Sequence, residues 1–446
     1  MTQDHSKTEP ALRRSIGPFQ VTLYALGSML GAGIYGLIGK AAGLLGNAIW
    51  IAFLVAMVTA LLTGLSYAAL GARYPRAGGA AYIAQRAFAQ PMLSYVVGLA
   101  VACAGLTSMA TGARVIGENM QSFPLFSQLP VAIGAVMVLA LLAALVFRGI
   151  VESMWVNVVC TFVEAGGLIL VIIVGLRFWG TVDYFETPAP ATTSGLSAVP
   201  LFLLLQGAVL TFYSFIGFED TLNVAEECKS PEVTVPVGLI SAMILAAVLY
   251  MAVAVTAVSV VPWRELAASP APLAEVITRA APWFPPWIFV VITVFAVGNT
   301  VLINFVTASR LVYGMARDGL LARTLAAIHP ARRTPHRAVA ALFCGVAALA
   351  VLGDISALAA ATVLLLLVVF VVINSALVVV KIRSDAAGLF DVPIAVPILG
   401  ALTACVLLIS RVTSEAFEAT AIAGGLLGAI VLLYVVTRPK GVPAEP

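Results

Sequence analysis

The sequence predicts an all-α polytopic membrane protein with twelve transmembrane helices. Of its 446 residues, 61% are hydrophobic and 10% are charged, and the mean hydropathy is +1.06. Soluble domains carry roughly 25% charged residues, so this chain has no room for a sizeable water-exposed domain. Apolar stretches long enough to cross a hydrocarbon core of about 30 Å recur along the chain, and glycines interrupt two of them.

Most of the apolar stretches are separated by links that contain polar residues, glycine or proline, which are typical helix boundaries, whereas the first two adjoin. The ninth and tenth stretches are separated only by Gly353-Asp354-Ile355-Ser356. In chain order, the predicted spans are 17–43, 44–72, 90–117, 129–147, 154–179, 198–225, 234–262, 284–316, 336–353, 357–381, 392–411 and 416–437.

The first and sixth spans carry the interruptions. Four of the ten residues in Gly27–Gly36 are glycine, and each costs about 0.8–1 kcal/mol relative to alanine inside a helix. The second interruption is Ser214–Glu219. Non-helical backbone at membrane depth persists only where protein buries it or a cavity hydrates it. Paired breaks in two halves of a chain therefore indicate a binding site and an inverted repeat of five spans each.

The expected organisation has two repeats followed by two appended helices. With the N-terminus in the cytoplasm, eighteen of the 24 Lys and Arg residues fall on the cytoplasmic side, as the positive-inside rule requires. We therefore expect a multi-pass protein of the inner (plasma) membrane with both termini cytoplasmic. The expected parts are an N-terminal tail (1–14), a first five-helix repeat (15–180), a second, inverted repeat (197–383), helices 11 and 12 (390–438) and a cytoplasmic tail (439–446).

Several functional classes find no support in the sequence. It contains no nucleotide-binding loop of the form GxxxxGK[ST], and its three His residues lie in polar segments without a catalytic constellation. The five Cys residues show no metal-ligand spacing, and a net charge of +3 gives no reason to expect nucleic acid. We expect no enzyme, no metal and no cofactor.

Four segments, in order, resemble the amino acid–polyamine–organocation (APC) superfamily, and the resemblance spans roughly residues 15–440. They are Gly27–Gly36 (first span), Arg73–Tyr82 (first cytoplasmic loop), Ser214–Glu219 with Ala225–Pro231 (sixth span and the loop after it) and Ser309–Gly319 (end of the eighth span). The resemblance implies a 5+5 inverted-repeat fold with discontinuous helices 1 and 6, and alternating access for amino acids or related amines.

A broken helix offers what a zwitterionic amino acid needs without charged side chains. The N-terminal end of a half-helix carries roughly +0.5 charge and free N–H groups. We expect Gly31-Ala32-Gly33-Ile34 to bind the carboxylate, and carbonyls near Met29 and around 213–215 to accept from the ammonium. The alternative is that these glycines only permit a close helix crossing.

Aromatic residues flank the second break. In the superfamily, aromatics at this place close the site from either side, so Tyr213, Phe215 and Phe218 are expected to face the substrate. The alternative is ordinary core packing. An apolar lining that includes Met29 and Ala32 favours a small or apolar neutral substrate.

Glu164 lies about ten residues into the fifth span, so roughly 15 Å deep. An ionised carboxylate there costs at least about 2.5–3.5 kcal/mol, so it must be protonated, paired or hydrated. Proton-coupled relatives carry lysine at what resembles this place, twelve residues after a pair like Glu152-Ser153. Glu164 departs from that pattern. It is expected to carry a proton, ligate a cation or pair with one, unless it is a neutral structural group.

Glu219 follows the second break. In exchangers of the superfamily an acidic residue here is implicated in proton sensing, so Glu219 is a second candidate for ion coupling. The alternative is a helix cap, worth 0.3–1 kcal/mol, and Asp220 shares both interpretations. The superfamily's sodium site joins spans 1 and 8, where Thr300 and Thr307 form no diagnostic pair. We therefore expect a proton in preference to sodium.

The sequence thus predicts a secondary transporter that imports amino acids across the inner membrane by proton-coupled symport. The substrate would be held at the unwound parts of helices 1 and 6. Three alternatives stay open: an amino acid/amine exchanger, a polyamine or cationic amino acid carrier, and a non-transporting membrane subunit of a complex.

Overall fold

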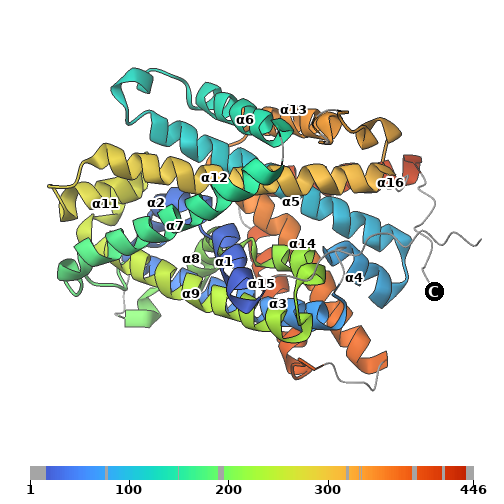
Figure 1. Cartoon of the computed structure of the whole chain (residues 1–446). Helices are drawn as coiled ribbons and strands as arrows, with labels where there is room; N and C mark the ends of the chain where they lie inside the picture. The colour runs from blue at the N-terminus through green and yellow to red at the C-terminus, as the bar shows by residue number, and fades with distance from the viewer. Residues whose placement is uncertain are drawn as a thin grey trace, which may run out of the picture.

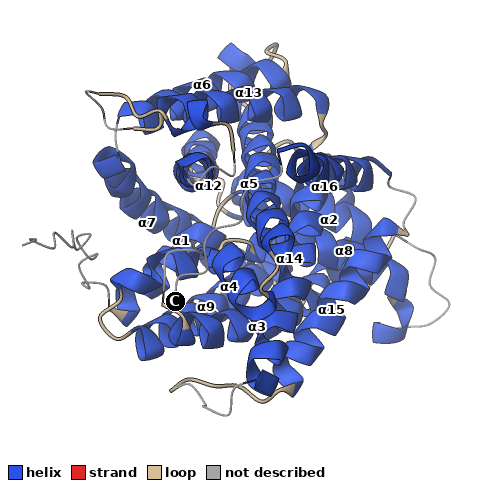
Figure 2. Ribbon diagram, turned by 90° about the vertical axis from the view of Figure 1, so that its right-hand side faces the viewer, coloured by secondary structure: helices blue, strands red, loops and turns tan. Residues whose placement is uncertain are grey.

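The computed structural model describes residues 17–75, 79–148, 150–188, 195–317, 321–330, 332, 334–383, 389–413 and 417–437. The predicted tails, 1–14 and 439–446, and parts of two motifs, 76–78 and 318–319, lie outside these ranges. Within the described ranges the chain is helical and contains no β-strand (Figure 2).

Sixteen α-helices make up the described structure. They are α1 (Pro18–Met29), α2 (Ala32–Leu45), α3 (Ile49–Arg73), α4 (Gly79–Phe88), α5 (Pro91–Met120), α6 (Val131–Arg148), α7 (Ile150–Gly175), α8 (Leu201–Phe212), α9 (Pro231–Val260), α10 (Trp263–Ala268), α11 (Pro272–Ala280), α12 (Pro286–Arg317), α13 (His336–Leu352), α14 (Ile355–Arg383), α15 (Ala395–Val412) and α16 (Phe417–Thr437). Short 3₁₀ helices include η5 (Tyr213–Phe215) and η6 (Phe218–Glu227).

The described helices include ten stretches with the length and hydropathy needed to cross a membrane. One of them, Ala32–Arg73, joins α2 and α3, and α13 is a shorter apolar helix. Helical segments lie in each of the twelve predicted spans. The chain is therefore a multi-pass, all-helical membrane protein.

Local sequence signals explain where several helices begin and end. Pro91, Pro231 and Pro272 stand at the first position of α5, α9 and α11, where the missing N–H is not needed and the fixed φ suits a helix. Gly46, with φ +62°, ends α2. The break between spans 9 and 10 falls between Leu352 and Ile355.

The broken spans lie in the middle of the bundle. Helices α1, α2 and α8 pack against α3, α5, α9, α12 and α14, and in Figure 1 they lie among these longer helices. Peripheral helices are much less buried: 22% and 17% of the most apolar stretches of α15 and α16 are buried, against 67% for α14. In both views α6 and α13 lie side by side on one flank (Figures 1 and 2).

Small residues allow the central helices to approach closely. A Cβ on Gly36 of α2 would lie 2.5 Å from Val115 of α5, and one on Gly112 would lie 2.7 Å from Val301 of α12. Helix packing in a bilayer depends on such close contacts, because lipid is as apolar as the side chains it would replace. The glycines therefore position α2 and α12 directly against α5, next to the first break.

Candidate functional site

The first span breaks at Leu30 and Gly31. Helix α1 ends at Met29, Leu30 is extended, and Gly31 adopts φ +134° before α2 begins at Ala32. This backbone conformation favours glycine. A Cβ on Gly31 would also lie 2.0 Å from Thr300 Oγ1 and 3.2 Å from the Ala296 carbonyl oxygen of α12. Conformation and close packing together require glycine here.

The sixth span breaks at Ile216 and Gly217. Helix α8 passes into η5, Ile216 is extended, and Gly217 adopts φ +119° before η6 begins. A Cβ on Gly217 would lie 2.6 Å from the carbonyl of Ser28 in α1. On the other side, a Cβ on Gly33 of α2 would lie 2.4 Å from Ser214 Cα. The two breaks therefore lie directly against each other.

The broken helix ends present groups of both signs. Gly31 has no side chain with which to cap α2, and the first intrahelical bond runs from Tyr35 N to Gly31 O. The N–H groups of Ala32, Gly33 and Ile34 thus form the open, electropositive end of α2. At the end of α1, the Met29 carbonyl accepts from Tyr250 Oη (2.7 Å).

A cavity of about 700 Å³, including the part open to solvent, lies where the two breaks meet. It is bounded by both broken spans, α5, α12 and α14. Five residues expected at the site, Met29, Ala32, Gly33, Tyr213 and Glu219, line it. Most of the remaining wall is made of small or aliphatic side chains.

A polar wall faces the breaks across the cavity. Ser108 Oγ and Tyr213 Oη are 2.9 Å apart, Tyr213 Oη lies 3.2 Å from the Ser108 carbonyl oxygen, and Asn304 Nδ2 donates to Ser108 Oγ (3.0 Å). These bonds join α5, the second break and α12. Tyr213 is thereby held at the cavity by its hydroxyl as well as by its ring.

Other expected site residues lie outside the lining. Phe215 is buried and its ring packs edge-on against Tyr250. Phe218 is buried between Tyr67 and Phe370, with ring centroids 5.6 and 5.2 Å away. Gly31 and Ile34 are also buried behind the lining. In this conformation both phenylalanines have the core packing that was the alternative interpretation.

Glu164 lies at the junction of α7 with α1, α2 and α12, away from the cavity lining. Its side chain is fully buried. Oε1 accepts a hydrogen bond from Asn299 Nδ2 (2.9 Å), whereas Oε2 has no hydrogen-bond partner among the described residues. Tyr35 Oη donates to the Glu164 backbone carbonyl (2.5 Å). A buried carboxyl oxygen without a donor is suited to carrying a proton and is costly as an anion.

Thr300 links Glu164's neighbourhood to the first break. It follows Asn299 on α12, and its Oγ1 donates to the Leu30 carbonyl oxygen (3.2 Å). Consecutive residues of one helix therefore contact the buried carboxyl and the unwound backbone.

The second acidic site lies at the break in span 6. Glu219 Oε2 accepts from Gly217 N (2.9 Å), which is the capping contact considered for the sequence. Asp220 Oδ2 accepts from Ser28 Oγ (2.8 Å), a bond between the two broken spans. Both carboxylates line the cavity. Glu219 therefore caps the second break and lines the cavity at the same time.

The described residues contain no group of three or more His, Cys, Asp or Glu side chains able to hold a metal ion. Of the span-8 hydroxyls considered for sodium, Thr300 contacts the first break as described, and Thr307 lines the cavity.

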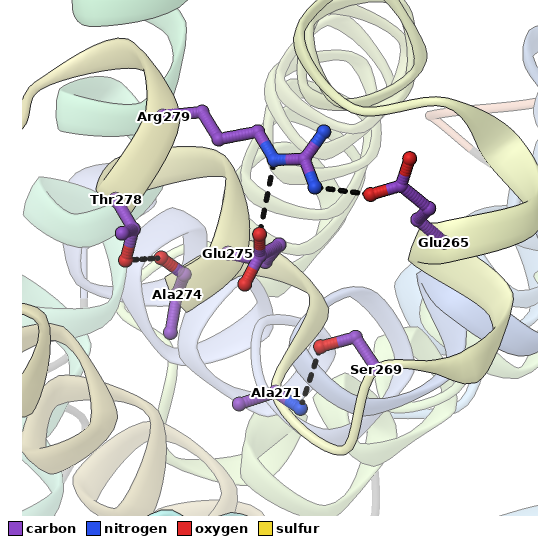
Figure 3. A network of polar contacts seen from close by, with 7 residues as sticks. All are labelled: Glu265, Ser269, Ala271, Ala274, Glu275, Thr278 and Arg279. Atoms are coloured by element: carbon purple, nitrogen blue, oxygen red, sulfur yellow. Dashed lines mark hydrogen bonds and ion pairs between the residues drawn. The ribbon is translucent and has the colours of Figure 1, made fainter.

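Short helices cover the far end of α2. A Cβ on Gly39 would lie 2.5 Å from the Leu266 carbonyl oxygen of α10 and 2.9 Å from Pro272 of α11. Figure 3 shows how these two short helices are joined: Arg279 bonds to Glu265 and, at 3.0 Å, to Glu275. The long segment between α9 and α12 thus forms a cover over this end of α2.

The contacts of several site residues were missed from the sequence because their partners are distant in the chain. The Ser28–Asp220 pair is 192 residues apart and the Asn299–Glu164 pair is 135 apart. Single polar residues within apolar spans were the available signal. That signal marks Ser108, Asn299 and Asn304 as unusual but does not say what they contact.

Comparison with known proteins matches the chain to a family of transporters. The family model described as Amino acid permease matches residues 16–434. The chloroplastic cationic amino acid transporter 9 of Arabidopsis thaliana is 30% identical over 349 residues, 74% of this chain and 60% of the relative. The mouse cationic amino acid transporter 4 is 28% identical over 80% of this chain and 58% of the relative.

A bacterial relative is covered more fully. The branched-chain amino acid permease BcaP of Bacillus subtilis is 28% identical over 78% of this chain and 76% of its own length. The two eukaryotic relatives are considerably longer than the part that matches, since the chain aligns with about 60% of each.

Proposed function

The chain belongs to the amino acid permease family of the APC superfamily, whose members are transporters and not enzymes, and from this premise we propose that it moves amino acids across the membrane. The cavity at two touching helix breaks carries the proposal. Relatives are named for cationic and for branched-chain amino acids, which supports an amino acid substrate and leaves its side chain open.

We place the substrate carboxylate at the N–H groups of Ala32, Gly33 and Ile34. The helix end is open, Gly33 lacks a side chain that would block approach, and both Ala32 and Gly33 line the cavity. The backbone carbonyls of Ser214 and Phe215 would accept from the ammonium. Binding to a half-helix end costs no buried charge on the protein.

Transport would proceed by alternating access in a twelve-span protein. The repeats would be residues 15–180 and 197–383, with α15 and α16 appended. The cavity extends from the breaks along α12 toward Leu311, while α10 and α11 cover the other end of α2. We place the permease in the inner (plasma) membrane with its N-terminus in the cytoplasm. In that orientation the cavity opens toward the cytoplasm, and the arrangement corresponds to an inward-facing state.

We propose that Glu164 couples transport to protons. The carboxyl is fully buried, one oxygen lacks a donor, and Asn299-Thr300 connects it to the Leu30 carbonyl. Gain or loss of a proton would change the charge beside the unwound backbone. Protonation of this carboxyl shifts the equilibrium between two conformations only if the carboxyl makes different interactions in each of them. Glu219 is the second candidate.

The experiment is uptake by the purified chain in proteoliposomes, with a panel of labelled amino acids and an imposed inward proton gradient. Concentrative uptake that a protonophore abolishes and that a sodium gradient does not replace would support proton-coupled transport. Uptake driven by sodium alone would overturn the choice of ion. Failure of every amino acid to enter, or to stabilise the protein thermally, would overturn the substrate class.

A further inference from the structure

The cavity lining carries acidic groups without a basic one. Glu219 and Asp220 are the carboxylates among the residues that line it, and none of these described residues is Lys, Arg or His. Glu219 is partly exposed to the cavity, and the Gly217 N–H engages only one of its two oxygens. An ionised carboxylate in a protein cavity at membrane depth is costly unless it takes up a proton or unless a positive charge or several donors face it.

Several neutral polar groups of the cavity already donate to other protein groups. Asn304 Nδ2 donates to Ser108 Oγ, and Thr300 Oγ1 donates to the Leu30 carbonyl. Ser108 and Tyr213 share a hydroxyl pair in which each has one proton to give. The Asn304 amide oxygen, by contrast, is an acceptor. The Asn304 amide oxygen and the two carboxylates thus remain as acceptors for a ligand that enters the cavity.

A separate observation indicates an unfilled polar position at the second break. Ser214 is 1% exposed, and its Oγ has no hydrogen-bond partner within the described structure. The hydroxyl faces Gly33, since a Cβ there would lie 2.6 Å from Ser214 Oγ, and Gly33 lines the cavity. Buried hydroxyl groups normally have a partner, so a ligand at the α2 terminus is the expected one.

We propose that the preferred substrate is an amino acid with a cationic side chain, and that Glu219 is the group that recognises that side chain. The inference rests on the proposed function, because the α-carboxylate is taken to lie at the α2 terminus. From there the side chain extends toward Glu219 or along the Asn304 wall, and both present acceptors. A neutral side chain would leave the Glu219 carboxylate without a positive partner. This differs from the small or apolar neutral substrate favoured by the sequence.

The test compares pairs of amino acids that share a shape and differ in charge. Lysine is paired with norleucine, and arginine with citrulline. Apparent dissociation constants are measured by ligand-induced thermal stabilisation of the purified full chain. A charge-assisted contact predicts about tenfold or more tighter binding of each cationic member. In Glu219→Gln this ratio should fall to about threefold or less, while norleucine affinity is retained.

Glu418→Gln is the matched control, because Glu418 is exposed in the first turn of α16 and the ratio of affinities should be unchanged in that variant.

If norleucine and citrulline bind wild type as tightly as lysine and arginine, the inference is overturned and amino acid transport stands. A Glu219→Gln protein that binds norleucine but keeps the cationic preference overturns the role of Glu219. If no amino acid of either class binds, the proposed function itself fails. The wild-type comparison decides the substrate class even if the variant does not fold.

Discussion

Asn299 Nδ2 of α12 donates a hydrogen bond to Glu164 Oε1 of α7 at 2.9 Å, and the next residue, Thr300, bonds the carbonyl of Leu30 at the first helix break. The buried carboxyl and the unwound backbone are thus connected through two consecutive residues of one rigid helix. A change in the protonation of Glu164 acts first on these contacts.

Thr300→Val tests this connection. The variant keeps the shape of the side chain and removes the donor to Leu30, so it should lower the free energy of unfolding by about 0.5–1.5 kcal/mol. Thermal unfolding in detergent measures the change. Thr403→Val is the control, because Thr403 on α15 bonds only carbonyls of its own helix. Equal effects in the two variants would mean that the contact with Leu30 contributes nothing specific.

Gly31→Ala tests whether the first break requires glycine. The substitution forces φ +134° on a residue with a side chain and brings Cβ to 2.0 Å from Thr300 Oγ1. We expect a loss of about 1–3 kcal/mol in stability from backbone strain alone, together with loss of amino acid binding. Gly425→Ala provides the comparison, since Gly425 on α16 has open space around it and alanine is the better helix former. A Gly31→Ala protein with wild-type stability would refute the described break.

Variants of Ser28 and Asp220 test the contact between the two breaks. The hydrogen bond to a carboxylate should make the effects of Ser28→Ala and Asp220→Asn non-additive, with a coupling of about 0.5–3 kcal/mol. A double-mutant cycle on thermal stability gives this quantity directly. Additive effects would mean that the two broken spans are not joined through this pair.

Lys381 and Asp391 supply a pH-dependent prediction outside the spans. Partial burial raises the pKa of Asp391, but hydrogen bonds from Lys381 Nζ, 2.6 Å away, and from the Val392 backbone lower it further, so the net pKa is below its usual range. The stabilisation is present above the unfolded-state pKa of about 3.9 and is lost as pH falls through the lower folded-state pKa.

Asp391→Asn should therefore destabilise the protein at neutral pH, and the difference from wild type should shrink in acid. Because the Asp391 side chain is 35% exposed, solvent screening limits the effect to at most about 1 kcal/mol. Urea unfolding at a series of pH values measures it. A difference that grows as pH falls would contradict the sign.

The breaks could be located from the sequence because their cause is local. Gly27–Gly36 and Ser214–Glu219 were predicted as interruptions, and the helices do end at Leu30-Gly31 and Ile216-Gly217. Positive φ at a glycine depends on the residue itself and its close neighbours. The family was recognisable for the same reason, since its motifs are short segments.

The contacts at the site could not be predicted in the same way. The packing of Phe218 against Phe370, and the bond between Ser108 and Asn304, join residues more than 150 positions apart. Polar residues inside a bundle are satisfied by tertiary neighbours, and one sequence does not specify which. For Phe215 and Phe218, the sequence shows only an aromatic residue next to a break. Such a residue is equally compatible with closing the site and with packing in the core.

The most direct test of the account is proton-driven uptake by Glu164→Gln in proteoliposomes, compared with wild type and with Glu418→Gln. We predict that wild type and Glu418→Gln concentrate substrate when an inward proton gradient is imposed. Glu164→Gln should still exchange labelled for unlabelled substrate but no longer respond to the gradient. If Glu164→Gln concentrates substrate in response to the gradient as wild type does, Glu164 is structural, and the coupling group must be sought at Glu219.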